Sequence, residues 1–369
     1  MFDSILFWFA VIALYLSNQL VTKSKYQLIL ISLVSPFLFY NFFGMYFVLF
    51  TILTLVIIVL LSNGVNLFFF KLEHRYALLL FLVLIIFNNE RLDFQLIGFS
   101  YFIIRFYDYI QSNRSIFLKA NLQNKIVNSI QLYSYLFPIH GILAGPLLQY
   151  DKYKNFKTCK ISFLSFQKAI FFILSGLIYK NIIAFYLSNY IDGLIVNSFY
   201  KSSLTLFYVF FDFAGYSLIA IGVGVLIGYQ LPINFNNPFT SKSIGEFFER
   251  WHISLSIMAK KHVFNPFQLF LIRGRLIKNI NLISSLSIIL TFLIIALCHK
   301  LSINFFYWGL FLGIVLSFEH LLKLRKKIDN FLKDKTIFKI CTLPLYIYTF
   351  VVISFSYFLL GDDLYNMIT

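Results

Sequence analysis

The sequence contains little charge for its length. Only 12% of its 369 residues are charged, and residues 26–70 contain no Asp, Glu, Lys or Arg. That uncharged stretch is about twice as long as one membrane span requires. The composition is 60% hydrophobic and 20% aromatic, whereas soluble domains are roughly 45–50% apolar. These values exclude an ordinary soluble domain and predict an all-α integral membrane protein.

Cysteine is also scarce. The three cysteines are Cys159, Cys298 and Cys341. Because their number is odd and no CxxC pair occurs, the sequence suggests neither a disulfide framework nor a zinc knuckle. The histidines do not form the HExxH motif of zinc proteases. We therefore expect no metal and no bound cofactor.

Apolar runs recur along almost the whole chain. They predict about ten membrane segments in one polytopic domain covering residues 1–369, and the first run is read as a span rather than a removed signal peptide. A shorter run at 134–149 is broken by glycine and proline, which is typical of a re-entrant segment beside a cavity. The other runs are 4–21, 27–43, 45–63, 76–89, 95–110, 168–189, 203–228, 280–298, 303–322 and 340–360.

The basic residues predict the orientation of the chain. Loops 257–279 and 323–339 are rich in Lys and Arg, which places both on the cytoplasmic side. The runs between them then form a hairpin whose turn points away from the cytoplasm. The formal net charge is +16. We assign this excess to contact with anionic membrane lipid rather than nucleic acid, although an acidic carrier protein would fit the same surface.

One short block gathers several ionisable groups in this apolar chain. In "GEFFERWHIS", residues 245–254, two acids, an arginine and a histidine lie within seven positions. Over the slightly longer block 245–256, "GEFFERWHISLS", helical spacing puts Phe247, Phe248, Trp251 and Leu255 on one broad apolar face. The block is therefore read either as an interfacial helix with solvated charges or as part of a functional site containing His252.

Three further polar residues interrupt apolar runs. Asp212 is the one charged residue between 202 and 240, so we expect it to face the protein interior with a partner. His299 ends a long apolar run. Neutral imidazole accepts protons near pH 7, which makes His252 and His299 candidates for general base catalysis. His140, in the broken run, is expected to be polar lining. The glycine pair at 224 and 228 predicts close helix packing.

The region 210–256 closely resembles the signature of the membrane-bound O-acyltransferase family, in its bacterial cell-envelope branch. That branch includes the D-alanyl transferase of teichoic-acid synthesis and the membrane subunit of alginate O-acetylation. The matching segments are "DFAGYS" at 212–217, "PINFNNP" at 232–238, "FFERWHISLS" at 247–256, "AGP" at 144–146 and "GFSYFIIRFYDYI" at 98–110. The resemblance covers residues of about 90–330.

The resemblance implies a funnel of tilted helices around a polar passage, with His299 and His252 as the catalytic histidines. His299 would take a proton from an acceptor hydroxyl, and His252 would orient the donor or stabilise the oxyanion. Asp212, Arg250, Trp251 and Asn234 would line the wall of the passage, with Asp212 and Arg250 as partners.

The implied reaction moves a D-alanyl or acetyl group from a cytoplasmic thioester, carried by an acyl-carrier protein or by CoA. The acceptor would be a hydroxyl of an extracytoplasmic polysaccharide or teichoic acid-like polymer. Expected partners are membrane lipid and an acidic carrier protein or extracytoplasmic accessory acyltransferase. The expected location is the bacterial inner membrane.

Two other functions stay open at the level of sequence. Broken helices and buried ionisable groups also fit a transporter or flippase of an envelope precursor. An inactive scaffold is suggested by Cys298-His299-Lys300, where the family usually has Trp-His-Gly, and by "IMAKKHV" at 257–263, which lacks the family's Arg-Asp pair.

Overall fold

The structure is a computed structural model that describes part of the chain. The described residues are 4–20, 29–35, 38, 99–113, 130–141, 145–154, 161–194, 199–275, 277–299, 302–322, 347 and 350–351. They are mostly helical, with turns, bends, short irregular segments and one isolated bridge between the helices. The predicted spans 45–63 and 76–89 lie outside them, as do most of 27–43 and 340–360.

Within the described residues, four helical stretches are long and apolar enough to cross a membrane. They agree with four of the predicted runs to within a few residues, because an unbroken apolar run defines such a helix well. The first described helix, α1 (Ile5–Leu20), is apolar but shorter. The four stretches are Phe163–Asp192, Phe199–Leu226, Ile280–His299 and Ile303–Leu322. The membrane character of the chain is thus clear, whereas the total of about ten spans stays a prediction.

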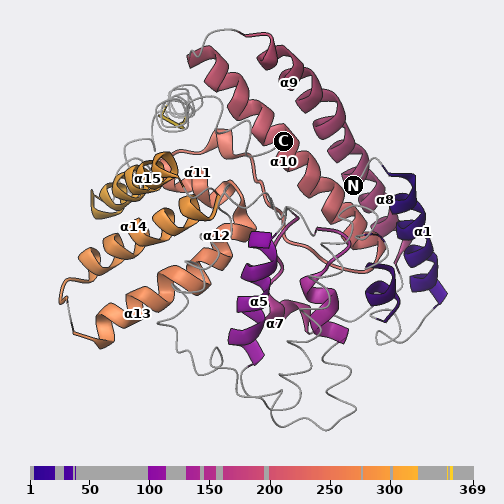
Figure 1. The fold of residues 1–369 in the computed structure, drawn as a ribbon, viewed down its shortest axis with the longest axis horizontal. Coiled ribbons are helices and arrows are strands. Elements are labelled where there is room, and N and C mark those ends of the chain that lie inside the picture. The colour runs from indigo at the N-terminus through magenta and orange to yellow at the C-terminus, as the bar shows by residue number, and fades with distance from the viewer. Residues whose placement is uncertain are drawn as a thin grey trace. The chain divides into compact units, whose positions relative to one another are not determined.

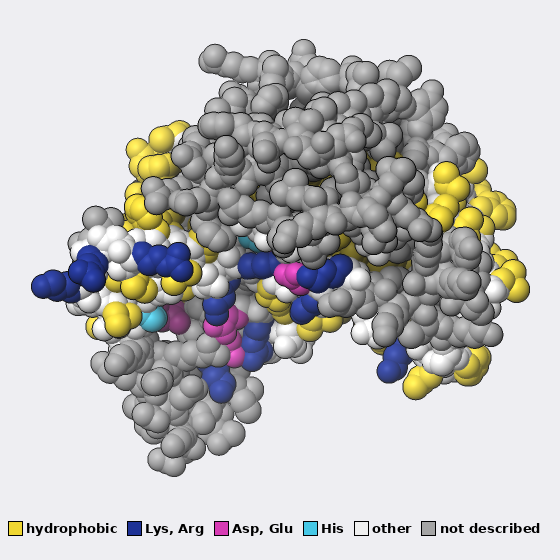
Figure 2. All heavy atoms as spheres, turned by 90° about the horizontal axis from the view of Figure 1, so that it is seen from below, with side chains coloured by type: hydrophobic (Ala, Val, Ile, Leu, Met, Phe, Trp, Pro, Cys, Tyr) yellow, Lys and Arg dark blue, Asp and Glu magenta, His cyan; other side chains and the backbone are white. Residues whose placement is uncertain are grey.

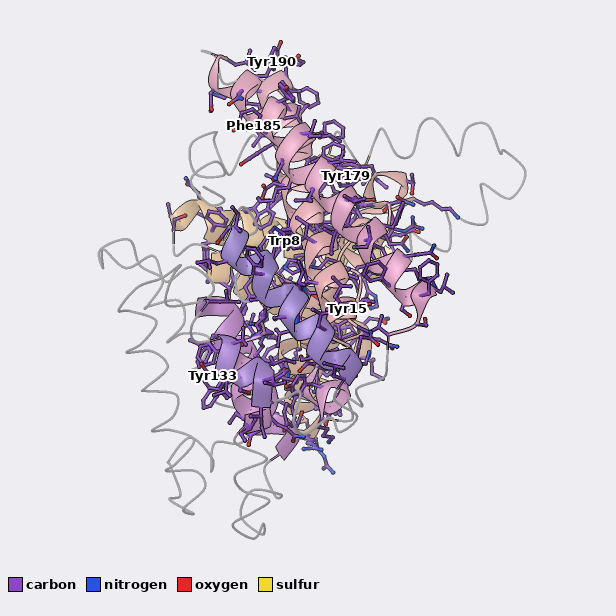
Figure 3. The ribbon with its side chains drawn as sticks, turned by 90° about the vertical axis from the view of Figure 1, so that its right-hand side faces the viewer. Trp8, Tyr15, Tyr133, Tyr179, Phe185 and Tyr190 are labelled. Carbon is purple, nitrogen blue, oxygen red and sulfur yellow. The ribbon has the colours of Figure 1, made fainter. Side chains whose placement is uncertain are left out.

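The stretch Phe163–Asp192 is made of three consecutive elements: α8 (Phe163–Leu177), the π-helical η4 (Ile178–Ala184) and α9 (Phe185–Asp192). Figure 3 shows Tyr179, Phe185 and Tyr190 following one another along it. Phe185 and Tyr190 are more than half exposed. Large exposed apolar side chains on a hydrophobic helix are suited to contact with lipid.

The chain divides into two compact units. The first contains residues 1–73, 97–176 and 216–232. In it, Gly222 lies against α8, since a Cβ there would be 2.7 Å from the carbonyl oxygen of Ala169. The sequence predicted close helix packing at Gly224 and Gly228. The structure instead uses Gly222 for helix contact, and Gly228 adopts a positive φ of 91° just after α10 (Phe199–Leu226).

The broken run of the first unit contacts α5 (Phe99–Asn113) through polar groups. The buried Arg105 donates from Nη2 to the carbonyl oxygen of Gly141 (2.6 Å). Asp108 Oδ2 accepts from the backbone N–H of Tyr150 (2.6 Å) and from the hydroxyl of Tyr135 (3.0 Å). The irregular backbone predicted around Pro138 is confirmed, and these buried bonds stabilise it where helix bonds are missing.

The second unit contains residues 74–96, 177–215 and 233–369. After the first part of α10 it has the short helices α11 (Ile244–Arg250) and α12 (Ile253–Ala259), the π-helical η6 (Lys260–Phe264) and α13 (Asn265–Arg273). The region 257–279 was predicted as a loop. It is mostly helical, because the basic residues there lie on an otherwise apolar helix rather than interrupting one.

The last described helices, α14 (Ile280–His299) and α15 (Ile303–Leu322), form the predicted hairpin and lie side by side in Figure 1. Small residues bring them together: a Cβ at Gly309 would be 2.6 Å from Cβ of Ala296. Ala296, Phe305, Trp308 and Leu312 form a buried cluster at this contact. His299 is thereby placed at the end of a closely packed helix pair.

Candidate active site

The candidate site lies in the second unit, where the backbone breaks between α11 and α12. Trp251 is extended, and His252 adopts the left-handed conformation, with φ of 49° and ψ of 52°. Left-handed backbone is unusual for a residue other than glycine and is found mainly at turns and functional sites. The single amphipathic helix expected over 245–256 is therefore wrong, since Leu255 lies on a second helix.

The segment 232–237 holds this break in place. The backbone N–H of Ile253 donates to the carbonyl oxygen of Asn234 (2.9 Å), and that of Asn236 donates to Arg250 O (3.0 Å). The side chain of Asn234, 1% exposed, accepts from the backbone N–H of Ser254 (3.3 Å). Asn234 thus caps the start of α12, where His252 makes no side-chain cap bond.

Aromatic rings surround the break. The His252 ring meets the Phe213 ring nearly at right angles, with centroids 4.6 Å apart. Phe213 also contacts Phe235 (5.1 Å), which in turn contacts Trp251 (5.2 Å). Trp251 stacks on Phe247 at 5.4 Å. The predicted wall residues Trp251 and Asn234 therefore both lie beside His252.

His252 is 7% exposed, and its surroundings disfavour the charged form. Burial lowers the pKa of His252 to about 3, and the neighbouring His299 adds a smaller effect in the same direction. His252 is thus neutral at pH 7 and can donate one N–H as an uncharged imidazole. The two predicted catalytic histidines lie in the same unit of the chain.

His299 is the last residue of α14 and is half-buried. Its ring lies 6.4 Å from that of Phe305 across the hairpin turn. Phe305 belongs to the buried cluster that joins α14 to α15. The two predicted histidines thus come from different parts of the second unit, and each has an aromatic neighbour: Phe213 for His252 and Phe305 for His299.

The charged groups around His252 are paired. Arg250 Nη2 donates to Glu246 Oε1 (2.6 Å), and Arg250 Nη1 donates to Thr240 Oγ1 (3.1 Å). Glu246 Oε2 accepts from the backbone N–H of Lys242 (2.8 Å). Glu246 and Arg250 thus join α11 to residues 240–242, which precede it in the chain.

The predicted partnership of Asp212 and Arg250 is wrong. Asp212, on α10, pairs with Lys180, which the π-helical turn η4 carries, while Arg250 pairs with Glu246. The expectation that Asp212 has a partner is correct. Sequence spacing did not indicate Lys180, because a lysine inside an apolar run gives no sign of which helix it faces.

Two more residues of the site were not predicted from sequence. Phe213 was quoted only as part of a motif, and its contact with His252 depends on how α10 is rotated. Glu319 accepts from the backbone N–H of Gly245 (3.1 Å), and its place as an acid in a long apolar run was the available signal. Within the described residues, no three His, Cys, Asp or Glu side chains are arranged to hold a metal ion.

Residues 82–361 match the sequence model of the membrane-bound O-acyltransferase family. A teichoic acid D-alanyltransferase of Bacillus subtilis is 29% identical over 60% of this chain and 58% of its own length. A peptidoglycan O-acetyltransferase of Helicobacter pylori is 32% identical over 50% of this chain and 36% of its own. A probable alginate O-acetylase of Azotobacter vinelandii is 38% identical over 31% of this chain and 22% of its own.

The matches therefore span at most about three-fifths of these relatives. The family match itself covers most of the chain and includes α10, the break at His252 and the α14–α15 hairpin. It agrees with the motif residues and with the apolar helices of the structure. The chain belongs to the membrane-bound O-acyltransferase family.

Proposed function

We propose that the protein is a membrane O-acyltransferase that uses His299 and His252 to acylate a hydroxyl of an extracytoplasmic cell-envelope polymer. The observation that carries the proposal is that the family match spans both histidines, with His252 at a left-handed break of the backbone whose flanking backbone is bonded to Asn234. The relatives are named for acylating teichoic acid, peptidoglycan and alginate. That variety supports a D-alanyl or acetyl group without selecting between them.

In the proposed step, His299 acts as general base. Its imidazole takes the proton of the acceptor hydroxyl, and the oxygen attacks the thioester carbonyl of the donor. A C–O bond forms, and the tetrahedral intermediate then loses its C–S bond. The departing sulfur receives the proton from the His299 imidazolium, so the enzyme returns to its starting state and an ester and a thiol are the products.

His252 is suited to a different task in the same step. As a neutral imidazole it donates a hydrogen bond to the oxygen that becomes negative during attack, without first losing a charge of its own. The bonds from Asn234 fix the backbone that follows His252, and Phe213 packs against its ring, so the imidazole is positioned before substrate arrives. A preorganised donor of this kind contributes about 10²–10³-fold to turnover.

The donor side of the proposal is supported by charge. Between α12 and the start of α14 the chain has five basic residues and no acid. Four of them are exposed, and dark-blue Lys and Arg side chains are visible on the face drawn in Figure 2. Such a surface suits an acidic carrier protein or the phosphates of CoA. The five are Lys260, Lys261, Arg273, Arg275 and Lys278.

The location that accompanies this proposal is a bacterial inner membrane, with an extracytoplasmic accessory acyltransferase as a further partner. An acidic carrier protein on the cytoplasmic side and a polymer acceptor on the other would require the acyl group to pass through the protein. The polar passage expected from the family supplies that route.

The test is a comparison of ester groups on envelope polymers by mass spectrometry and NMR. Four strains are needed: a deletion, the restored wild type, His299→Gln and His320→Gln. His320 is an exposed histidine near the end of α15, so it controls for the loss of a histidine as such.

We expect an ester that disappears on deletion, returns with wild type and His320→Gln, and stays absent with His299→Gln at normal protein level. The mass of that ester identifies the acyl group. Restoration by His299→Gln would remove His299 from the mechanism. An unchanged ester profile in all strains would instead favour the transporter or the inactive scaffold.

A further inference from the structure

Helix α11 is attached at several points to the α14–α15 hairpin. At its start, the backbone N–H of Gly245 donates to Oε2 of Glu319 (3.1 Å). One turn later, the ring of Phe248 meets that of Phe292 on α14 (5.2 Å). The helix then ends at Arg250, two residues before His252. The Glu319 bond therefore fixes the end of α11 that is remote from the histidine.

The hairpin itself is a closely packed pair. A Cβ at Gly313 would be 2.7 Å from Cα of Ile289, so the two backbones touch there. The hydroxyl of Ser317 donates to the carbonyl oxygen of Ser285 (2.8 Å). Such close backbone contacts leave little freedom for one helix to slide along the other. Glu319, two residues beyond Ser317, and His299, at the end of α14, thus belong to the same packed helix pair.

The start of α11 needs acceptors for its first backbone N–H groups. Ser243 provides one, since its hydroxyl oxygen accepts from the N–H of Glu246 (3.1 Å). Glu319 provides another from a separate helix, as a carboxylate at the positive end of the helix dipole. A Cβ at position 245 would lie 3.0 Å from Oε1 of Glu319, so the carboxylate would have to shift away from the backbone N–H to make room for it.

We propose that Glu319 is a positioning residue, which sets where α11 lies along the hairpin and hence how His252 stands relative to His299. The two histidines are on separate elements, and α11 is the element that leads from the Glu319 contact to His252. This inference rests on the proposed function, in which His252 and His299 act on one tetrahedral intermediate. The length of the side chain and its oxygen acceptor are the properties that matter.

The activity arm of the test uses three variants. Glu319→Ala removes the acceptor, Gly245→Ala pushes the carboxylate away, and Glu319→Gln keeps an oxygen at the same distance. We expect the two alanine variants to lower the ester content of the envelope, per amount of protein, by about 10- to 100-fold, the scale of a misplaced catalytic group. Glu319→Gln should retain most of it. The double variant Gly245→Ala/Glu319→Ala should lose no more ester than either single variant, since both changes disrupt the same hydrogen bond.

A structural arm measures the positions directly in purified protein. Cys159, Cys298 and Cys341 are replaced by Ser, and spin labels are attached at Ile257→Cys on α12 and Ile303→Cys on α15, both exposed positions. Pulsed electron paramagnetic resonance then gives the distribution of distances between the labels. We expect a narrow distribution with Glu319 or with Glu319→Gln, and a broadened or shifted one with Glu319→Ala.

Failure of this inference is distinguishable from failure of the proposed function. If wild type transfers the acyl group and His299→Gln does not, the function holds. An unchanged distance distribution in Glu319→Ala, or a loss in Glu319→Gln as large as that in Glu319→Ala, would then overturn the role of Glu319. If wild type transfers no acyl group, the label distances still decide whether Glu319 positions α11.

Discussion

The rings of His252 and Phe213 meet at 87°, with their centroids 4.6 Å apart. This contact joins the break after α11 to the middle of α10, which is far away in the sequence. Perpendicular aromatic pairs at this distance contribute about 0.5–1.5 kcal/mol beyond the burial of their surface. The contact thus restricts the orientation of the His252 ring.

Replacing Phe213 by Leu keeps most of the volume and removes the perpendicular ring. We expect acyl transfer to fall by roughly tenfold, a change of about 1.4 kcal/mol in the activation free energy, with little change in the melting temperature. Envelope ester content at matched protein level measures it. Phe306→Leu is the control, because Phe306 lies on α15 and its ring contacts that of Tyr307. Equal losses in both variants would contradict the role of Phe213.

Asn234→Ala should destabilise the start of α12. The Oδ1 acceptor of the buried Ser254 N–H is lost, and a buried N–H without an acceptor costs about 1–3 kcal/mol. Ser254 lies two residues after His252, so we expect the loss of this bond to lower acyl transfer as well. Asn234→Asp keeps an oxygen at that position and should recover a large part of the activity. A melting curve and an ester assay on both variants test this, and full activity in Asn234→Ala would exclude the proposed role of Asn234.

The pair of Lys180 and Asp212 predicts a specific pattern of stabilities. Either single change, Lys180→Met or Asp212→Asn, leaves one charge without its partner inside a largely apolar helical stretch. We expect each to lower the free energy of unfolding by roughly 1–3 kcal/mol, less than for a fully buried pair because both side chains are partly exposed. The double variant should lose less than the sum of the single ones.

Thermal unfolding of the four proteins in detergent gives the coupling energy. A charge-reversed pair, Lys180→Asp with Asp212→Lys, should recover part of the loss. The reversed pair Asp212→Arg with Arg250→Asp serves as the matched comparison, since Arg250 pairs with Glu246 instead. If stability is recovered by the reversed pair of Asp212 and Arg250 and not by that of Lys180 and Asp212, the observed ion pairs are contradicted.

The elements that sequence predicted well are those encoded by one continuous pattern. The hairpin of α14 and α15 follows from two apolar runs separated by a short polar turn, and its bounds were predicted almost to the residue. The catalytic candidates His252 and His299 were found because motif residues are chemically unusual in an apolar chain. Neither inference required knowledge of tertiary contacts.

What was predicted incorrectly depends on tertiary contacts. Helical spacing over 245–256 is compatible with one helix, and the break at His252 exists because Asn234 and its neighbours supply backbone partners from elsewhere in the chain. The partner of Asp212 depends on the rotation of η4, which periodicity does not reveal. Glu319 stands out in sequence as an acid in a long apolar run, but its partner is a backbone N–H, and a backbone group has no signature in sequence.

Acidification provides a separate measure of how His252 is buried. Burial lowers the pKa of His252 to about 3 in the folded protein, whereas an exposed histidine in the unfolded chain has a pKa near 6.5. Between these two values the unfolded chain binds a proton that the folded protein does not. The free energy of unfolding therefore falls as the pH is lowered below about 6.5, by up to about 1.4 kcal/mol per pH unit for this one group.

The His252→Gln variant lacks the group that binds this proton. The free energy of unfolding of the variant should therefore depend less steeply on pH than that of wild type. Thermal unfolding in detergent at pH 7.5 and pH 5.0 measures the difference, and the wild type should lose more than the variant on acidification. His320→Gln is the control, since the exposed His320 should leave the wild-type slope in place. An identical loss in wild type and His252→Gln would mean that His252 is protonated readily. A protonated His252 would not act as the neutral donor assigned to it in acyl transfer.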